Sequence, residues 1–76
     1  MATKSQATPE RIGELIRVKR EKLSMNRETL AVKAGIGITT LSNIENGYGI
    51  PRKATLQKIA DVLGIRLPDM VIRIRN

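Results

Sequence analysis

The stretch AGIGITTLSNIENG, residues 34–47, decides the fold of this chain. Gly35 is a natural stop for a short helix of about residues 27–34, and Gly37 can cap a second helix. Gly47 can end this second helix in the left-handed conformation that glycine adopts readily. Two short helices joined by a tight turn that contains glycine form a helix-turn-helix, so the stretch predicts that motif.

A longer helix is expected before the motif, from about residue 9 to residue 22. Thr8 can act as its N-cap, and Pro9 suits the first turn because the missing N–H of proline would have no partner there in any case. The apolar face of this helix is expected to contain four residues at helical spacing: Ile12, Leu15, Ile16 and Leu23.

The same spacing defines the buried faces of the helices that follow. Asn26 is the expected N-cap of residues 27–34. The clearest amphipathic pattern comes after the loop at Pro51 and is closed by Gly64. The expected inward residues of the three helices are, in order, Leu30, Ala31 and Ala34, then Leu41 and Ile44, then Leu56, Ile59, Ala60 and Leu63.

The C-terminal residues are compatible with two structures. Pro68 can begin a fifth short helix, whereas the alternation of apolar and basic residues at 71–75 suits a strand. The sequence therefore predicts an all-α fold of four to five short helices, with a short C-terminal strand as the alternative for the last residues. The expected divisions are a flexible arm at residues 1–8, a helix-turn-helix domain at 9–72 and a tail at 73–76.

The composition favours one small domain without catalytic or metal chemistry. The chain has 76 residues, of which 41% are hydrophobic, and its core must be aliphatic because Tyr48 is the only aromatic residue. Cysteine and histidine do not occur in the sequence, which excludes disulfides, thiol nucleophiles, imidazole bases and the usual zinc sites. The carboxylates are scattered, and no nucleophile has a base partner. We therefore expect neither an enzyme nor a cofactor.

The charge points to a polyanionic partner. The 14 Lys and Arg residues outnumber the 7 Asp and Glu residues and give a formal net charge of +7, yet none of them falls between Lys33 and Arg52. Nucleic acid is the first candidate for such a partner. A membrane is not expected, because no apolar run approaches the ~18 residues of a membrane span and the basic residues do not gather on one face. The expected location is cytoplasmic.

A set of residues spread over about residues 12–71 has a familiar spacing. Its members are Arg20, Leu30-Ala31, Gly35, Leu41, Ile44-Glu45-Asn46-Gly47, Pro51, Leu56, Ile59-Ala60 and Leu63-Gly64. In these residues the chain resembles the five-helix DNA-binding domains of the phage repressor and Cro type, the XRE-like family with the lambda-repressor-like fold. The resemblance implies that the second helix of the motif enters the major groove of double-stranded DNA. It also implies a transcriptional regulator, expected to be a repressor, that binds its operator as a homodimer in a bacterial or phage-infected cell.

The residues expected to read bases lie on the outer stripe of this helix, opposite its apolar positions. They are short and uncharged: Ile38, Thr39, Ser42 and Asn43. Asn43 is the best candidate for hydrogen bonds to a base, with adenine as the expected partner, against the alternative of a solvated surface amide. Ile38 either touches a thymine methyl group or folds back onto the protein.

Contacts to the DNA backbone are expected from Asn26, Arg27, Thr40, Asn46, Tyr48, Arg52 and Lys53. Asn26 caps a helix whose exposed N–H groups suit a phosphate. Arg27 is expected to take the same phosphate or to reach guanine, the alternative being a plain surface arginine. Thr39 and Thr40 suit a base or a phosphate but also fit ordinary first-turn positions. Tyr48 either donates to a phosphate or packs against the loop.

The remaining expectations concern structural and partner contacts. The resemblance pairs Arg20 with Glu45 in a partly buried salt bridge between two helices. The candidates for a dimer interface are Met70, Ile72 and Ile74, against the alternative of a frayed terminus that only adds positive charge. The sequence also leaves open whether the chain binds a protein partner, either a polymerase or a toxin. The alternative function is an antitoxin-type helix-turn-helix protein whose main role is to bind such a partner.

Overall fold

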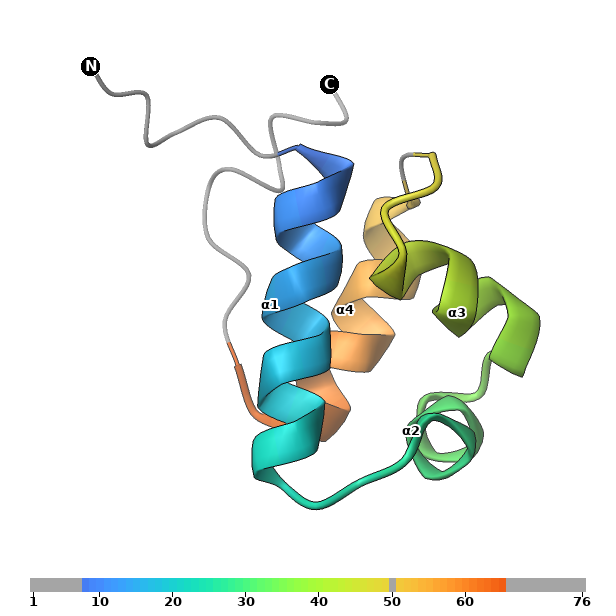
Figure 1. The fold of residues 1–76 in the computed structure, drawn as a ribbon. Helices are drawn as coiled ribbons and strands as arrows, with labels where there is room; N and C mark the ends of the chain where they lie inside the picture. The colour runs from blue at the N-terminus through green and yellow to red at the C-terminus, as the bar shows by residue number, and fades with distance from the viewer. Residues whose placement is uncertain (1–7, 50, 66–76) are drawn as a thin grey trace.

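The computed structural model describes residues 8–49 and 51–65, which contain four helices and no strand (Figure 1). Along the chain these are α1 at Pro9–Lys22, α2 at Arg27–Ala34, α3 at Ile38–Glu45 and α4 at Lys53–Leu63. The predicted all-α fold is confirmed. The expected fifth helix, the alternative strand and the dimer candidates Met70, Ile72 and Ile74 lie outside the described residues. The division into arm, domain and tail stays a prediction.

The helix ends follow the local chemistry of the sequence. The Oγ1 atom of Thr8 accepts a hydrogen bond from the Arg11 N–H at 3.1 Å, and Oδ1 of Asn26 accepts one from the Thr29 N–H at 2.8 Å. These bonds satisfy donors that the first turn of a helix leaves without partners. At the other end of α2, Gly35 adopts a left-handed conformation with φ of 72°, as predicted for a glycine stop.

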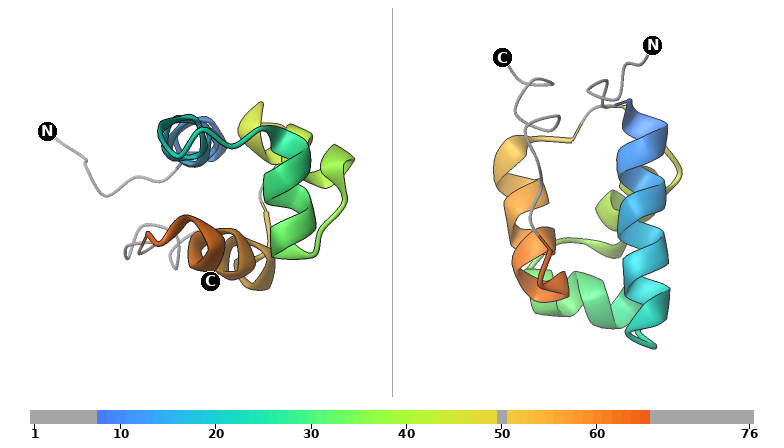
Figure 2. Two further views of the ribbon diagram at one scale, coloured as in Figure 1. Left: turned by 90° about the horizontal axis from the view of Figure 1, so that it is seen from below. Right: turned by 90° about the vertical axis from the view of Figure 1, so that its left-hand side faces the viewer.

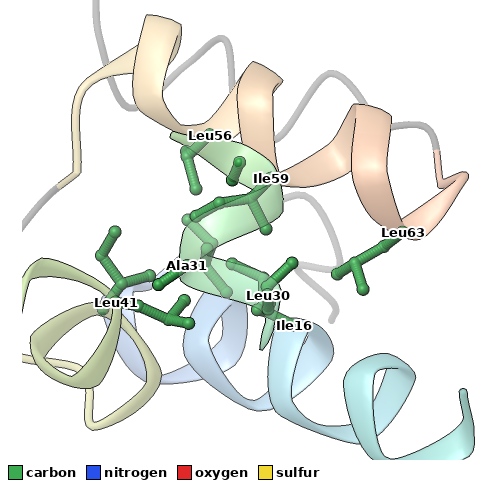
Figure 3. Close-up of a cluster of buried hydrophobic side chains, with 10 residues drawn as sticks. Ile16, Leu30, Ala31, Leu41, Leu56, Ile59 and Leu63 are labelled. Carbon is green, nitrogen blue, oxygen red and sulfur yellow. The ribbon is translucent and has the colours of Figure 1, made fainter. Parts of the chain in front are cut away.

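The four helices enclose one aliphatic core. In two perpendicular views α1 and α4 run side by side, and α2 crosses near one end of the pair (Figures 1 and 2). Helix α3 packs against α1 and α2 at the edge of the bundle. Side chains from all four helices meet in the centre (Figure 3). The fully buried large ones are Ile12, Ile16, Leu30, Leu41, Leu56 and Ile59.

The predicted apolar face of α1 is wrong at two of its four positions. Leu15 is 38% exposed and Leu23 is 45% exposed, whereas Gly13 and Arg20 are buried. Leu23 is the C-cap residue, so it lies beyond the last turn that packs on the core. Arg20 takes an inward position because its partner Glu45 is also inside. The spacing of apolar residues cannot predict that a charged residue is buried together with its partner.

Gly13 allows α1 and α3 to approach closely. A Cβ atom at this position would overlap the carbonyl oxygen of Ile44 and would lie 2.7 Å from that of Glu45. Both neighbours are backbone atoms, which cannot rotate away as a side chain can. The missing side chain of Gly13 therefore sets the distance between α1 and the C-terminal end of α3.

Within the described part of the chain, no helix has the length and apolar character needed to cross a bilayer.

Candidate nucleic-acid interface

Helix α3 has an inner and an outer side with different chemistry. Leu41, Ile44 and Glu45 are buried on the inner side. The outer side, taken to include the C-cap Asn46, has no charged residue. Five of its six residues are exposed, and the sixth, Ser42, is half-buried: the exposed ones are Ile38, Thr39, Thr40, Asn43 and Asn46. Helix α3 lies at the edge of the bundle (Figure 1), and these exposed residues lie opposite its buried ones. The structure thus brings the residues expected to read bases onto one accessible surface.

The outer side of α3 is arranged in three rows, because residues one turn apart share a direction. Ile38 and Ser42 form the row next to α2, and Ser42 Oγ accepts a long hydrogen bond of 3.4 Å from Nη1 of Arg27. The middle row contains Thr39, Asn43 and Asn46. The third row has only Thr40 on the outer side, and Thr40 lines a depression together with the loop residues Tyr48 and Gly49.

The carboxylate of Glu45 binds two arginines. Its side chain has no exposed surface, and its oxygens accept hydrogen bonds from Nε and Nη2 of Arg20 at 2.7 and 3.0 Å. A further bond of 2.9 Å comes from Nε of Arg27. Arg20 also donates through Nη1 to the Met25 carbonyl oxygen at 2.8 Å. This cluster of Arg20, Glu45 and Arg27 joins α1, α2 and α3 beneath the outer side of α3.

The electrostatics of the cluster keep Glu45 ionised. Burial is the largest single influence on this carboxylate and opposes ionisation, but the hydrogen bonds and charges of Arg20 and Arg27 together outweigh it. The pKa of Glu45 is therefore lowered from its ordinary value. The hydrogen bond with Glu45 raises the pKa of Arg20, against a smaller opposing effect of burial. The glutamate contributes to folding as an anion and has no exposed oxygen to offer to a ligand.

Arg27 has a structural contact that the sequence analysis missed. It was expected at a phosphate or at guanine, and the structure turns its guanidinium inward to Glu45 and Ser42. The side chain is still 36% exposed, and a guanidinium has five N–H donors, so a phosphate contact remains compatible with this geometry. Arg27 and Glu45 are 18 residues apart, and no local pattern signals the pairing. Asn26, which precedes Arg27 in the chain, is exposed and uses its side-chain oxygen to cap α2.

On the other side of α3, a shallow depression of about 300 Å³ separates the helix from the start of α4. Its polar lining comes from Thr40, Asn43, Tyr48, Arg52 and Thr55. Tyr48 is 68% exposed, which argues against the alternative that it only packs. Exposed Lys53 follows Arg52 as the first residue of α4.

Thr55 also lines this depression, although the sequence did not single it out. It lies three residues after Arg52, the N-cap of α4, so helical spacing could have indicated it. Thr55 is half-buried and lines the same depression as Thr40. Within residues 8–49 and 51–65, no group of three or more metal-binding side chains is close enough to hold an ion.

The chain is similar to known regulatory proteins over most of its length. Residues 16–70 match a family model described as helix-turn-helix. The HTH-type transcriptional repressor RghR of Bacillus subtilis (strain 168) is 39% identical over 57 residues, which cover 74% of this chain and 42% of the relative. The ImmF control region 10 kDa protein of Bacillus phage phi105 is 35% identical over 57 residues, which cover 75% of this chain and 63% of the relative.

This chain spans less than two thirds of the length of each of these relatives. The segment matched by the family model contains α2, the turn at Gly35 and α3, the elements that form the predicted motif. From this match and from the fold, the chain belongs to the helix-turn-helix family.

Proposed function

We propose that the chain is a transcriptional regulator that reads an operator in double-stranded DNA with the outer side of α3. The observation that carries this proposal is the distribution of charge around α3. Short, uncharged side chains occupy the exposed surface of the helix, and basic residues flank it on both sides. Base edges are read by shaped hydrogen-bonding and apolar groups, whereas phosphates attract cations without regard to sequence.

The flanks suit the two phosphate backbones that border a major groove. On one side, Asn26 and Arg27 lie at the start of α2, where free N–H groups also favour an anion. On the other side, Tyr48 and Arg52 line the depression next to α3, with Lys53 beside them. With four to six phosphates neutralised per protomer, the logarithm of the affinity should fall against the logarithm of the salt concentration with a slope of about −4 to −5.

Repression is the expected outcome of binding. One relative is named as a transcriptional repressor and the other as a phage control-region protein, so we propose that this chain blocks polymerase at a promoter. Such a regulator would act where the DNA is, in the cytoplasm of a bacterium or of a phage-infected cell. No cofactor is needed for this mechanism.

Helix-turn-helix regulators commonly bind two half-sites about one helical turn apart, so a homodimer on DNA is also proposed. Met70, Ile72 and Ile74 are the candidates for its interface. Truncation after Asp69 should weaken operator binding far more than it lowers the melting temperature. Equal binding by the full and the truncated chain would refute this interface.

Selection of binding sites from a random duplex library at near-physiological salt tests the proposed function. We expect enrichment of two inverted half-sites whose centres are about ten base pairs apart. Binding that enriches no sequence and disappears as the salt concentration rises would contradict the proposal, because the positive charge would then act only as a general attraction to polyanions.

A further inference from the structure

The outer side of α3 offers two kinds of contact to a base. Ile38 and Thr39 present methyl groups, and Asn43 and Asn46 present amides. In the major groove, thymine is distinguished by its C5 methyl group, which favours apolar contacts, and adenine by a donor and an acceptor that match an asparagine amide. Both chemistries belong to the same base pair.

The contacts that select a G·C pair are missing from this surface of α3. Guanine is read most often by Arg or Lys, and cytosine by the carboxylate of Asp or Glu. No basic residue occurs between Lys33 and Arg52 in the sequence, so α3 has none. The one carboxylate of the helix belongs to Glu45, whose side chain is fully buried and bound to two arginines.

The nearest arginine, Arg27, lies outside α3 and already has two partners at the edge of the outer side. Two N–H groups of Arg27 are directed to Glu45 and Ser42. The other N–H groups of Arg27 can bind a phosphate or a base, but any base contact from Arg27 is made from α2 and not from α3. Ser42 accepts from Arg27 and can bind to any base, so it does not favour either pair.

The exposure of Ile38 favours contact with a thymine methyl group over the alternative that this side chain folds back onto the protein. Its side chain is 43% exposed at the first residue of α3, in the row that also contains Ser42. An isoleucine left this open keeps apolar surface available for a partner. Asn43 lies one turn after Thr39 in the middle row, so methyl and amide groups lie next to each other along the helix.

We infer that α3 reads A·T base pairs in each half-site, with thymine recognised through its methyl group by Ile38 and Thr39 and adenine through hydrogen bonds by Asn43. This specificity rests on the proposed function, because it requires α3 to lie in the major groove. Guanine and cytosine in the operator are then read by side chains outside α3 or are not read directly.

The test begins with the duplex obtained by binding-site selection with the full chain. Thymidines in each half-site are replaced one at a time by deoxyuridine, which keeps the base pair and removes only the methyl group. Deoxyadenosines are replaced by 7-deaza-2′-deoxyadenosine, which removes the N7 acceptor. Affinities are measured for the wild type and for Thr39→Ser, which deletes one methyl group and keeps the hydroxyl, with Thr40→Ser as the matched control at the edge of the surface.

We expect A·T pairs at the positions whose base preference changes in Asn43→Ala. Deoxyuridine at one or more of these should weaken wild-type binding about fourfold, the effect of losing the burial of one methyl group. Thr39→Ser and Ile38→Ala should each abolish the difference in affinity between thymine and uracil at the base pair that the substituted residue contacts. Thr40→Ser should leave this difference unchanged. Melting curves identify any variant that fails to fold, and Thr39→Ser at an exposed site provides the answer if Ile38→Ala does not fold.

Two outcomes would overturn the inference while the proposed function stands. One is an enriched operator with G·C pairs at the positions that depend on Asn43. The other is unchanged affinity after replacement of every thymine by uracil. Failure to enrich any sequence would overturn the proposed function, and this specificity with it.

Discussion

The two sides of α3 reverse the usual distribution of charge between the inside and the surface of a protein. The inner side contains a buried glutamate held by two arginines, while the exposed outer side has no charge at all. Charged residues are almost never buried without a partner, and exposed helix faces are usually rich in them. In the proposed function, this reversal separates two tasks within a helix of eight residues: the inner side fixes the position of α3, and the outer side is left accessible to DNA.

The largest effect should come from removal of the buried charge on the inner side. Glu45→Ala leaves Arg20 with no partner for two of its hydrogen bonds in a buried site, and removal of one member of such a pair costs about 3–5 kcal/mol. A small domain has about 5 kcal/mol to lose, so we expect a chain that is largely unfolded or melts at a much lower temperature. Thermal unfolding measured by circular dichroism checks this.

Glu14→Ala is the matched control for the loss of one carboxylate. Glu14 is exposed on α1, so its removal should change the stability by less than about 1 kcal/mol. Equal melting temperatures for Glu45→Ala and the wild type would contradict the role of the buried cluster.

Gly13→Ala should be the next largest change. Alanine is a better helix former than glycine by about 1 kcal/mol, so without a close neighbour the substitution would stabilise α1. The new Cβ atom would instead meet the backbone carbonyls of Ile44 and Glu45, and overpacking of this kind typically costs about 1–3 kcal/mol or more. We expect a net loss of stability in urea unfolding. A more stable Gly13→Ala protein would show that α1 and α3 do not approach closely.

The inner side should also make the fold sensitive to acid. The pKa of Glu45 is lowered from its ordinary value of 4.5, so the folded state binds this proton less readily than the unfolded state. The stability that this group contributes is then fully present above pH 4.5 and is lost as the pH falls through the lower folded pKa. An NMR titration of the Glu45 carboxyl carbon in the folded protein checks the direction. A midpoint above 4.5 would contradict it.

The smallest effect is expected from the cations that flank the outer side. Arg52→Gln should weaken binding about equally for all duplexes and reduce the magnitude of the salt slope by about 1. Lys58→Gln, at an exposed position in the middle of α4, is the matched control with the same loss of charge. A change of base preference in Arg52→Gln would mean that this residue reads sequence and that the separation between the helix and its flanks is incomplete.

Local patterns were sufficient to predict most of the fold. The caps at Thr8 and Asn26, the stop at Gly35 and the buried face of α4 all depend on residues within one or two turns. Contacts between helices were not accessible in the same way. The packing of Gly13 on α3 depends on how two distant segments approach each other, and the sequence shows there only a weak helix former.

The sequence predicted the part of the candidate site that lies on one helix, but not the contacts that depend on how the helices pack. The outer stripe of α3 follows from helical periodicity once Leu41 and Ile44 are placed inside, and the structure exposes this stripe. The inward contact of Arg27 and the place of Thr55 beside Thr40 depend on the packing of α2 and α4 around α3. The contacts of these residues with DNA stay predictions.

The central claim is that the outer side of α3 reads sequence without supporting the fold, and Asn43→Ala tests it most directly. Binding-site selection and thermal melting would be measured on this variant and on Gln57→Ala, which exchanges an exposed amide of α4 for a methyl group. We expect Asn43→Ala to melt like the wild type, to bind the selected operator about 5- to 150-fold more weakly and to lose preference at one base pair per half-site. Gln57→Ala should retain the wild-type preference. An Asn43→Ala protein that selects the wild-type operator with unchanged affinity, or that is destabilised as strongly as a core variant, would contradict the account.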